Sequence, residues 1–202
     1  HGKNRVEGVT IAEVDSKFNE IEGTREYINC DTLLLSVGLI PENEISQKAE
    51  VTLDPRTKGP FVDSNMQTEI PGIFSCGNVL HVHDIVDFVT RESRIAGKNA
   101  ARFARGELNN KKYVDVYPGD KLIYVLPQRI ALDDENGALI CFRSRKIYRN
   151  PIVKIYSEDK ELIEKKYKII VPSEMIQIPL KNDVIKNIKG SIRVDIEGEE
   201  ND

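Results

Sequence analysis

The sequence predicts an α/β unit followed by an all-β unit. Three observations support this order: a nearly continuous apolar run that suits a buried parallel strand, then an apolar period that suits one long helix, then a series of short β-rich runs. The formal charge divides in the same way, because residues 1–105 carry a net charge of −4 and residues 106–202 carry none. We therefore expect a boundary near residue 105.

The composition of the 202 residues excludes several classes of protein. A net charge of −4 without any basic block argues against a nucleic-acid partner. A charged fraction of 31%, together with short apolar runs, argues against a membrane span. Three scattered cysteines form neither a disulfide framework nor a metal-binding spacing, so a reducing, cytoplasmic location is expected.

The first half is predicted to begin with strands. Residues 5–30 favour short strands that are separated by a turn at Gly23-Thr24. Residues 32–37, Thr-Leu-Leu-Leu-Ser-Val, are typical of a central parallel strand that is covered on both faces. The turn residues from Pro55 to Pro60 predict a small hairpin between residues 51–54 and 61–63.

A strand, a glycine turn and a helix are predicted next. Residues 68–78 favour a short buried strand that ends on Gly77-Asn78, and the helical period starts at Asp84, a candidate N-cap. The apolar residues close to one helix face are Ile85, Val89, Ala96, Ala100 and Phe103. Free backbone N–H groups at such a helix start favour an anionic or electron-rich ligand group. From spacing alone, an ordinary strand–helix connection without a ligand is the alternative.

The second half predicts a small antiparallel sandwich, of which the immunoglobulin-like sandwich is one form. Its six β-rich runs are residues 122–125, 138–142, 152–156, 167–171, 175–178 and 192–196. The segment that precedes them, residues 106–119, is polar at its start and is predicted to be a linker.

Two segments carry a resemblance to a known family. Residues 68–78, Thr-Glu-Ile-Pro-Gly-Ile-Phe-Ser-Cys-Gly-Asn, and a helix that ends near Gly97-Lys98-Asn99-Ala100-Ala101 resemble the second flavin motif of the pyridine nucleotide-disulfide oxidoreductase superfamily, which includes thioredoxin reductases. Residues 30–41 are similar to the segment by which such chains return from the NAD(P)H domain to the FAD domain. The resemblance covers about the first half of the chain. It implies a partial Rossmann-like FAD/NAD(P)-binding fold, with FAD and NAD(P)H as cofactors.

The resemblance also implies roles for individual residues, whereas it assigns no catalytic residue. Gly77 would let the backbone approach the ribityl-phosphate region of FAD. Asn78 stands where the family has Asp, so the hydrogen bond to a ribityl hydroxyl would lose its charge assistance. The helix that begins near Asp84 would direct its N-terminus at the pyrimidine edge of the flavin, and Val79 and Val86 would contact the ring system.

Missing motifs imply that the chain is the C-terminal portion of a longer flavoprotein. The sequence has no Gly-x-Gly-x-x-Gly loop for FAD or NAD(P)H, and no Cys-x-x-Cys pair. The predicted parts are the tail of the NAD(P)H-binding domain (1–28), the C-terminal part of the FAD-binding domain (29–105), the linker (106–119) and a β-rich extension (120–202). Residues 124–130 and 171–175 are similar to segments in the extension of bacterial NAD(FAD)-dependent dehydrogenases.

The expected function is that of an FAD-dependent oxidoreductase that passes electrons from NAD(P)H through the flavin to an unknown acceptor. A disulfide and a partner oxidoreductase are the candidate acceptors, and a homodimer is common in the family. The fragment alone is expected to be inactive. The alternative is a non-catalytic β-sandwich adaptor with a vestigial flavin site.

No metal site is expected from the sequence. His81 and His83 are two residues apart, but only Asp84 and Asp87 lie close enough in sequence to complete a site, so a role in a loop or at a helix start is favoured. Cys76 is expected to be a small buried residue at a strand end rather than a redox group, because it has no partner cysteine.

Overall fold

The chain forms two compact units, His1–Gly38 and Leu39–Asp202, in a computed structural model that describes residues 1–36, 38–109, 112–198 and 200–201. The first unit is an antiparallel hairpin of β1 (Gly8–Ile11) and β2 (Glu26–Asn29), with Gly8 opposite Asn29. The prediction of short strands here is confirmed.

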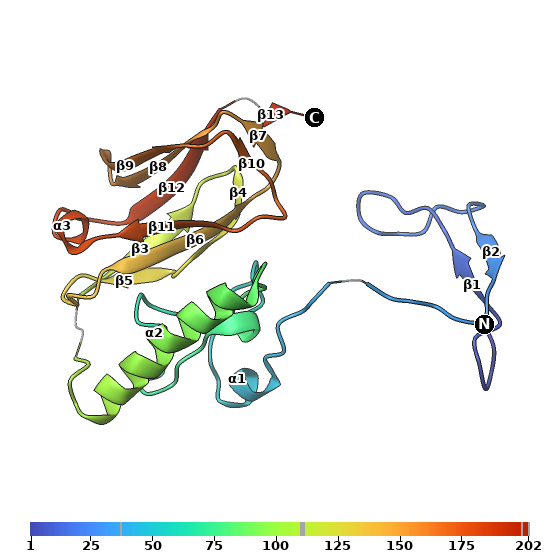
Figure 1. Ribbon diagram of the computed structural model, residues 1–202, viewed down its shortest axis with the longest axis horizontal. Helices are drawn as coiled ribbons and strands as arrows, with labels where there is room; N and C mark the ends of the chain where they lie inside the picture. Colours follow the sequence, from blue (N-terminus) through green and yellow to red (C-terminus); the bar gives the residue numbers. More distant parts are fainter. Residues whose placement is uncertain (37, 110–111, 199, 202) are drawn as a thin grey trace. The chain divides into compact units, whose positions relative to one another are not determined.

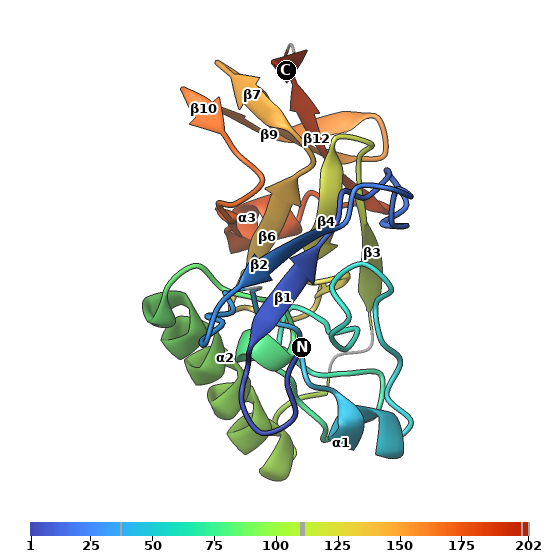
Figure 2. The ribbon, with the colours of Figure 1, turned by 90° about the vertical axis from the view of Figure 1, so that its right-hand side faces the viewer.

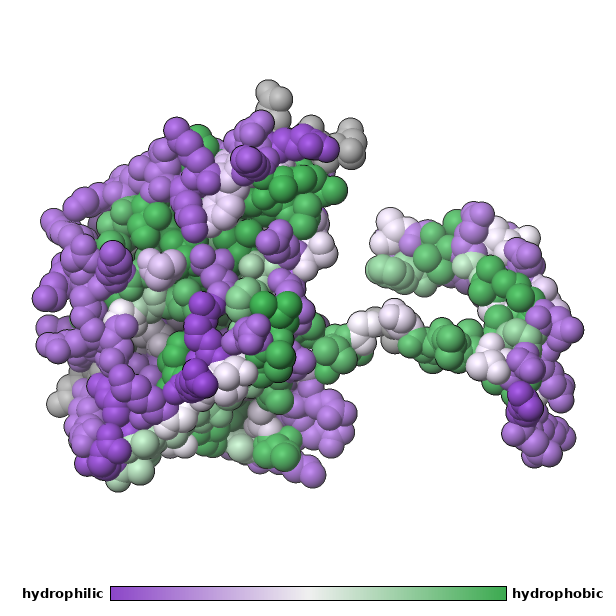
Figure 3. Space-filling view, viewed as in Figure 1, coloured by the Kyte–Doolittle hydropathy of each residue, from purple (hydrophilic) through white to green (hydrophobic). Residues whose placement is uncertain are grey.

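The central strand predicted at residues 32–37 is not formed by the described residues 32–36, and Val37 lies outside the described residues. Leu34 is 90% exposed and Leu35 is 72% exposed, and the hydrophobic side chains of this segment are green in Figure 3. A parallel strand needs a neighbour that pairs with its N–H and C=O groups, and no described strand pairs with this segment. The apolar pattern is therefore present without the sheet that it predicts.

The second unit starts with turns and helices (Figure 1). These helices are α1 (Glu44–Lys48), the 3₁₀-helix η1 (Gly77–Val79) and the long α2 (Val86–Ala104). The hairpin predicted at residues 51–63 is present as a short bridge between Leu53 and Pro60. The strand predicted at residues 68–78 is not formed: its start is a tight turn, in which the Thr68 N–H donates to the Ile73 carbonyl at 2.9 Å, because Pro71-Gly72 breaks the strand, and its end belongs to η1.

The β-rich part is a sandwich around one apolar core. One sheet has the order β11 (Ile176–Leu180), β6 (Ala138–Ser144), β4 (Leu122–Leu126). The second has the order β5 (Arg129–Ala131), β3 (Tyr113–Pro118), β12 (Ile192–Glu197), β8 (Ile152–Ser157), β9 (Lys160–Lys166). A small third sheet joins β10 (Ile169–Ile170), β7 (Ile147–Arg149) and β13 (Glu200–Asn201), and α3 spans Asn182–Ile185.

Two details differ from the sequence prediction. The sandwich is not wholly antiparallel, because β12 pairs with β3 in parallel, with Ile192 opposite Val116. The predicted linker, 106–119, contains β3, a strand inside the five-stranded sheet; residues 110 and 111 of that range lie outside the described residues. Val114 and Val116 alternate with polar neighbours, which is the period of a half-buried strand.

The α2 region and the sandwich share a second core, so residues 39–202 form one unit rather than two. Figures 1 and 2 both show α2 below the ends of β4 and β6. The buried side chains of this shared core are Val62, Met66, Leu80, Ala96, Tyr124, Leu126, Cys141 and Met175. Gln128 adds polar contacts, since its Oε1 accepts from the Val62 N–H at 3.0 Å and its Nε2 donates to the Asp54 carboxylate at 3.1 Å.

An ion pair joins the C-terminal part of α2 to the sandwich. Arg102 Nη1 lies 2.8 Å from the carboxylate of the buried Asp134. Burial raises the pKa of Asp134, but the hydrogen bonds from Arg102 and Asn136 outweigh it and hold this pKa below its ordinary value. The pair therefore stabilises the fold above the ordinary pKa of Asp, and this contribution is lost as the pH falls through the lowered pKa.

We expect Arg102→Leu to lower the free energy of unfolding by about 1–3 kcal/mol at pH 7, because it leaves a buried carboxylate without its cation. The difference in unfolding free energy between the wild type and the variant should shrink below about pH 4, where Asp134 becomes protonated in the variant. Urea unfolding at several pH values measures both effects. The control is Arg105→Leu, whose partner Glu107 is exposed, and it should behave as the wild type does. A deficit that is independent of pH would contradict the ion-pair explanation.

No helix in the described part of the chain is long and apolar enough to cross a lipid bilayer.

Candidate functional site

The segment from Cys76 to Ile85 contains η1 and leads into α2, and together with Val86, the first residue of α2, it holds the predicted site residues. Gly77 has a φ of 71°, in the left-handed region that favours glycine. Its carbonyl accepts from the Leu80 N–H at 2.9 Å and from the His81 N–H at 3.2 Å, which closes the 3₁₀ turn. The chain is then extended at Ile85 and enters α2 at Val86.

The N-terminus of α2 has no side-chain cap among the described residues. The N-cap residue is Ile85, not the predicted Asp84. Ile85 is 48% exposed and Val86 is 72% exposed, and the side chain of Val79 on η1 is also exposed. The Phe88 N–H donates to the Ile85 carbonyl at 3.2 Å, and the N–H groups before it are presented together with apolar side chains at the start of the helix.

Asp84 does not cap α2 because its carboxylate is engaged by the sandwich. One oxygen pairs with the Arg143 guanidinium on β6, and the other accepts from the Met175 N–H at 2.7 Å. Arg143 Nη2 also donates to the Val82 carbonyl at 3.1 Å. Asp84 thus fixes the turn to the β-rich part.

Asn78 and Gly77 contact two polar residues, His83 and Glu92. Asn78 is exposed, and its Oδ1 accepts from the His83 N–H at 3.1 Å. The Gly77 N–H donates to the Glu92 carboxylate, which lies on the buried face of α2. The backbone N–H of Gly77 is therefore already paired, whereas the side chain of Asn78 remains at the surface.

Glu92 joins His81 and His83 in a buried cluster that the sequence did not reveal. Nε2 of His81 lies 2.9 Å from Glu92 Oε1, and Nε2 of His83 lies 3.0 Å from Glu92 Oε2. The side chains of His81, His83 and Glu92 are 1%, 2% and 8% exposed. Nδ1 of His81 lies 3.2 Å from the Tyr124 hydroxyl on β4, whereas Nδ1 of His83 is buried without a partner in the described structure.

Burial and hydrogen bonding shift the pKa values of this cluster. Burial alone would raise the pKa of Glu92, but hydrogen bonds from His81 and His83 outweigh it and lower this pKa to about 2. Burial also lowers the pKa of His81, despite the neighbouring Glu92. Near neutral pH the cluster therefore contains an ionised carboxylate beside a neutral His81 ring.

The three cysteines are free in the described part of the chain, at positions 30, 76 and 141. Burial raises the pKa of Cys141 to about 12, so its thiol is not a nucleophile. Cys76 is half-buried at the start of η1, more exposed than the sequence predicted.

The sequence profile described as "pyridine nucleotide-disulphide oxidoreductase" matches residues 3–111, which is more than half of the chain. The protein therefore belongs to this family, whose members depend on FAD and NAD(P)H. The match ends where the β-rich part begins, at β3.

Known relatives agree with this assignment. The chain is 33% identical over 78 residues to a dihydrolipoyl dehydrogenase of Manduca sexta. The matched residues are 37% of this chain and 16% of that protein. It is 27% identical over 81 residues to a ferredoxin–NADP reductase of Picrophilus torridus, and the matched residues are 40% of this chain and 23% of that protein. It is 37% identical over 60 residues to a mitochondrial dihydrolipoyl dehydrogenase of Caenorhabditis elegans, and the matched residues are 29% of this chain and 12% of that protein.

The chain thus spans less than a quarter of the length of each of these relatives. No solved structure matches the chain.

The residues at the start of α2 fit the edge of a flavin. Val79, Ile85 and Val86 are exposed apolar side chains, which suit a flat aromatic ring, and the uncapped N–H groups of α2 suit its electron-rich edge. The surface side chain of Asn78 lies on the same turn. Asp84 does not fit a direct contact, because Arg143 and Met175 already bind its carboxylate.

Proposed function

We propose that this chain is part of an FAD-dependent oxidoreductase that passes electrons from NAD(P)H through the flavin to an acceptor. The domain order that we propose is that of the thioredoxin reductases, with a disulfide or a partner oxidoreductase as the acceptor. FAD, when bound, supplies the hydride-accepting and electron-transferring chemistry. The residues of this chain would bind and orient it.

The uncapped start of α2 is the observation that carries the proposal. A helix start without a side-chain cap is satisfied by water or by a ligand, and here it is surrounded by the exposed Val79, Ile85 and Val86. We propose that Val79 and Val86 contact the flavin ring and that the N–H groups of α2 stabilise negative charge at its edge. Gly77 would allow close approach of the cofactor, and Asn78 would bond a ribityl hydroxyl. Asp84 would act by holding this turn against β6.

The 202 residues alone are proposed not to oxidise NAD(P)H, because the sequence has no glycine-rich dinucleotide loop. The whole protein, rather than this chain alone, would bind the electron acceptor, and a homodimer is the proposed assembly. A reducing, cytoplasmic location is also proposed, on the ground that the three cysteines are too scattered to form a disulfide framework.

A non-catalytic adaptor is the second candidate function. The shared core of Leu80, Tyr124 and Met175 supports it, because this core lets residues 39–202 fold as one unit that could serve as a binding module without a cofactor. The two candidates differ in whether the Asn78 turn binds flavin.

We expect Asn78→Asp to bind FAD about 5-fold more tightly than the wild type, because a charged acceptor adds about 1 kcal/mol to one hydrogen bond. The measurement is the quenching of flavin fluorescence during titration of FAD into the flavin-free gene product that contains these residues. Asn187→Asp is the control, because it adds the same charge at an exposed position beside α3. Equal affinities for all three proteins would place the flavin away from Asn78, and no binding by any of them would favour the adaptor.

A further inference from the structure

We propose that His81, His83 and Glu92 bind a divalent transition-metal ion of the zinc type. This inference goes beyond the proposed function and does not depend on it. The two histidines lie two residues apart after η1, and Glu92 comes from the second turn of α2. Their ligand atoms all lie within 4.8 Å of one another. Two imidazoles and one carboxylate are a donor set that zinc uses in proteins.

The distances within the cluster match those between neighbouring ligands of one ion. The two Nε2–Oε separations are 2.9 Å for His81 and 3.0 Å for His83. Bonds of about 2.0–2.2 Å to a tetrahedral or octahedral ion place neighbouring donor atoms roughly 2.9–3.5 Å apart. The two separations end on different oxygens of the Glu92 carboxylate, so the three ligand atoms, which lie within 4.8 Å of one another, would draw together around the ion.

Outer contacts already orient two of the three ligands. The Tyr124 hydroxyl lies 3.2 Å from Nδ1 of His81, which leaves Nε2 as the atom that faces Glu92. The Gly77 N–H donates to the carboxylate of Glu92. Metal-binding histidines and carboxylates are usually held by such hydrogen bonds on their far side. The three ligands come from two segments, the turn that follows η1 and the helix α2, so the ion would also join this turn to the helix.

Charge also favours a cation at this place. Glu92 is buried, and the nearby guanidinium of Arg143 is paired with Asp84 rather than with Glu92. The partners of this carboxylate are the His81 and His83 rings and the Gly77 N–H, so no permanently charged cation balances it among its described contacts. No cysteine and no further carboxylate completes the cluster within the described residues, so a water molecule would take the fourth position. Imidazole donors favour zinc-like ions over magnesium or calcium.

A metal-free hydrogen-bonded network is the competing explanation, and metal titration separates the two. The chain is purified without chelator, its metal content is measured by plasma mass spectrometry, and the apo form is titrated with ZnCl₂ and CoCl₂ in a calorimeter. All proteins carry His1→Ala, which removes the remaining histidine of the sequence. We expect one equivalent of Zn²⁺, a higher melting temperature with Zn²⁺, and an intense visible spectrum for the Co²⁺ form.

The variants test the assignment of the ligands. His83→Ala and Glu92→Gln should each weaken Zn²⁺ binding at least about 100-fold. His83→Cys keeps a ligand at this position, so its Co²⁺ form should gain a sulfur-to-metal charge-transfer band; this variant decides the question if the other two do not fold. Asp87→Asn is the control and should bind as the parent does. Failure of the parent to bind Zn²⁺ or Co²⁺ below about 100 µM, or equal binding by every variant, would overturn the proposal.

Discussion

Leu80→Ala is expected to lower the free energy of unfolding of the chain by about 2–5 kcal/mol, the largest effect of a single truncation near the site. Leu80 is completely buried directly after η1 and belongs to the core that α2 shares with β4 and β6. The cavity would therefore weaken the helix and the sandwich together. Urea unfolding gives the magnitude, and hydrogen exchange shows whether the amides of α2 and β6 lose protection to the same extent.

Leu34→Ala removes the same atoms from a side chain that is 90% exposed, so its stability should equal that of the wild type. If hydrogen exchange of Leu80→Ala were faster in α2 while β6 kept its protection, the two halves would unfold separately. The shared core would then be a contact between two domains rather than the centre of one unit.

Gly59→Ala is expected to cost about 3 kcal/mol or to prevent folding of the site. A Cβ atom at this glycine would lie 1.9 Å from the carbonyl oxygen of Leu80, so backbone rather than a flexible side chain would have to move. The turn at residues 54–60 would be pushed away from η1. Thermal unfolding measures the loss of stability, and hydrogen exchange at residues 77–85 reports on the site.

Gly97→Ala is the matched control, and it is expected to raise the stability of the chain rather than to lower it. A Cβ atom at Gly97 meets no atom within 4 Å in the interior of α2, so the higher helix propensity of Ala should stabilise the chain by about 0.5–1 kcal/mol. Equal effects of the two substitutions would contradict the close packing of the 54–60 turn against Leu80.

Periodic patterns predicted most of the long elements of the fold, although they missed β9, whose charged residues mask its strand period. The apolar period placed a helix from Asp84, and α2 spans Val86–Ala104. Five of the six β-rich runs correspond to strands of at least five residues, whereas residues 167–171 form only the short β10. The segment with β3 was assigned to a linker because the polar residues before it dominated the pattern, although Val114 and Val116 alternate as a strand requires.

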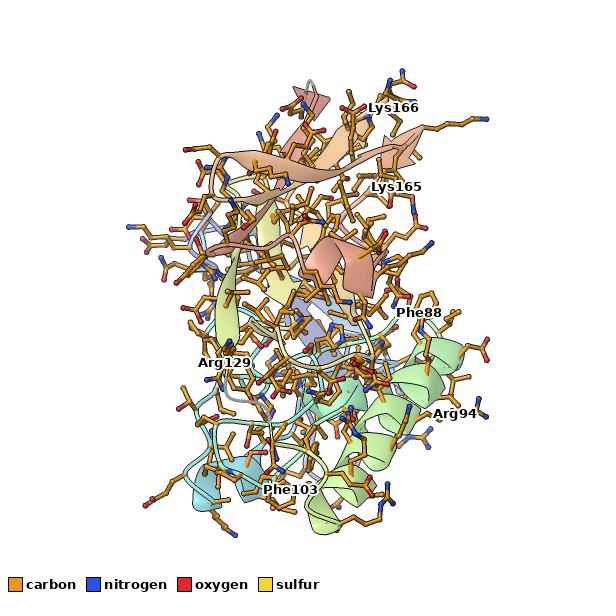
Figure 4. All side chains as sticks on the ribbon, turned by 90° about the vertical axis from the view of Figure 1, so that its left-hand side faces the viewer. Phe88, Arg94, Phe103, Arg129, Lys165 and Lys166 are labelled. Carbon is orange, nitrogen blue, oxygen red and sulfur yellow. The ribbon has the colours of Figure 1, made fainter. Side chains whose placement is uncertain are left out.

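The partners of buried polar groups could not be predicted from periodicity. Of the apolar helix face that the sequence predicted, the structure buries Ala96 but leaves Ile85 and Phe103 exposed; Figure 4 shows Phe103 near one end of α2. The other buried residues of α2 are the polar Glu92 and Asn99, which the apolar period did not indicate. Glu92 is buried because His81 and His83 bond to it. A spacing of i, i+4 and i+7 from Glu92 through Ala96 to Asn99 was the available signal.

The backbone order around the candidate site was predicted, whereas its polar contacts were not. The glycine turn followed by a helix was visible in the sequence, whereas the capping role of Asp84 was wrong because Arg143, 59 positions away, binds its carboxylate. Such a contact between the helix start and β6 depends on how the sandwich packs, which local spacing does not contain.

The central claim, that these residues bind the flavin of an NAD(P)H-dependent enzyme, is tested most directly by one absorbance experiment. The gene product that contains these residues is purified without added cofactor, and its spectrum is recorded before and after anaerobic addition of NADH and then NADPH. We expect flavin bands that bleach with one of the two nucleotides. A colourless protein that cannot be reconstituted with FAD would contradict the claim and leave the adaptor as the function.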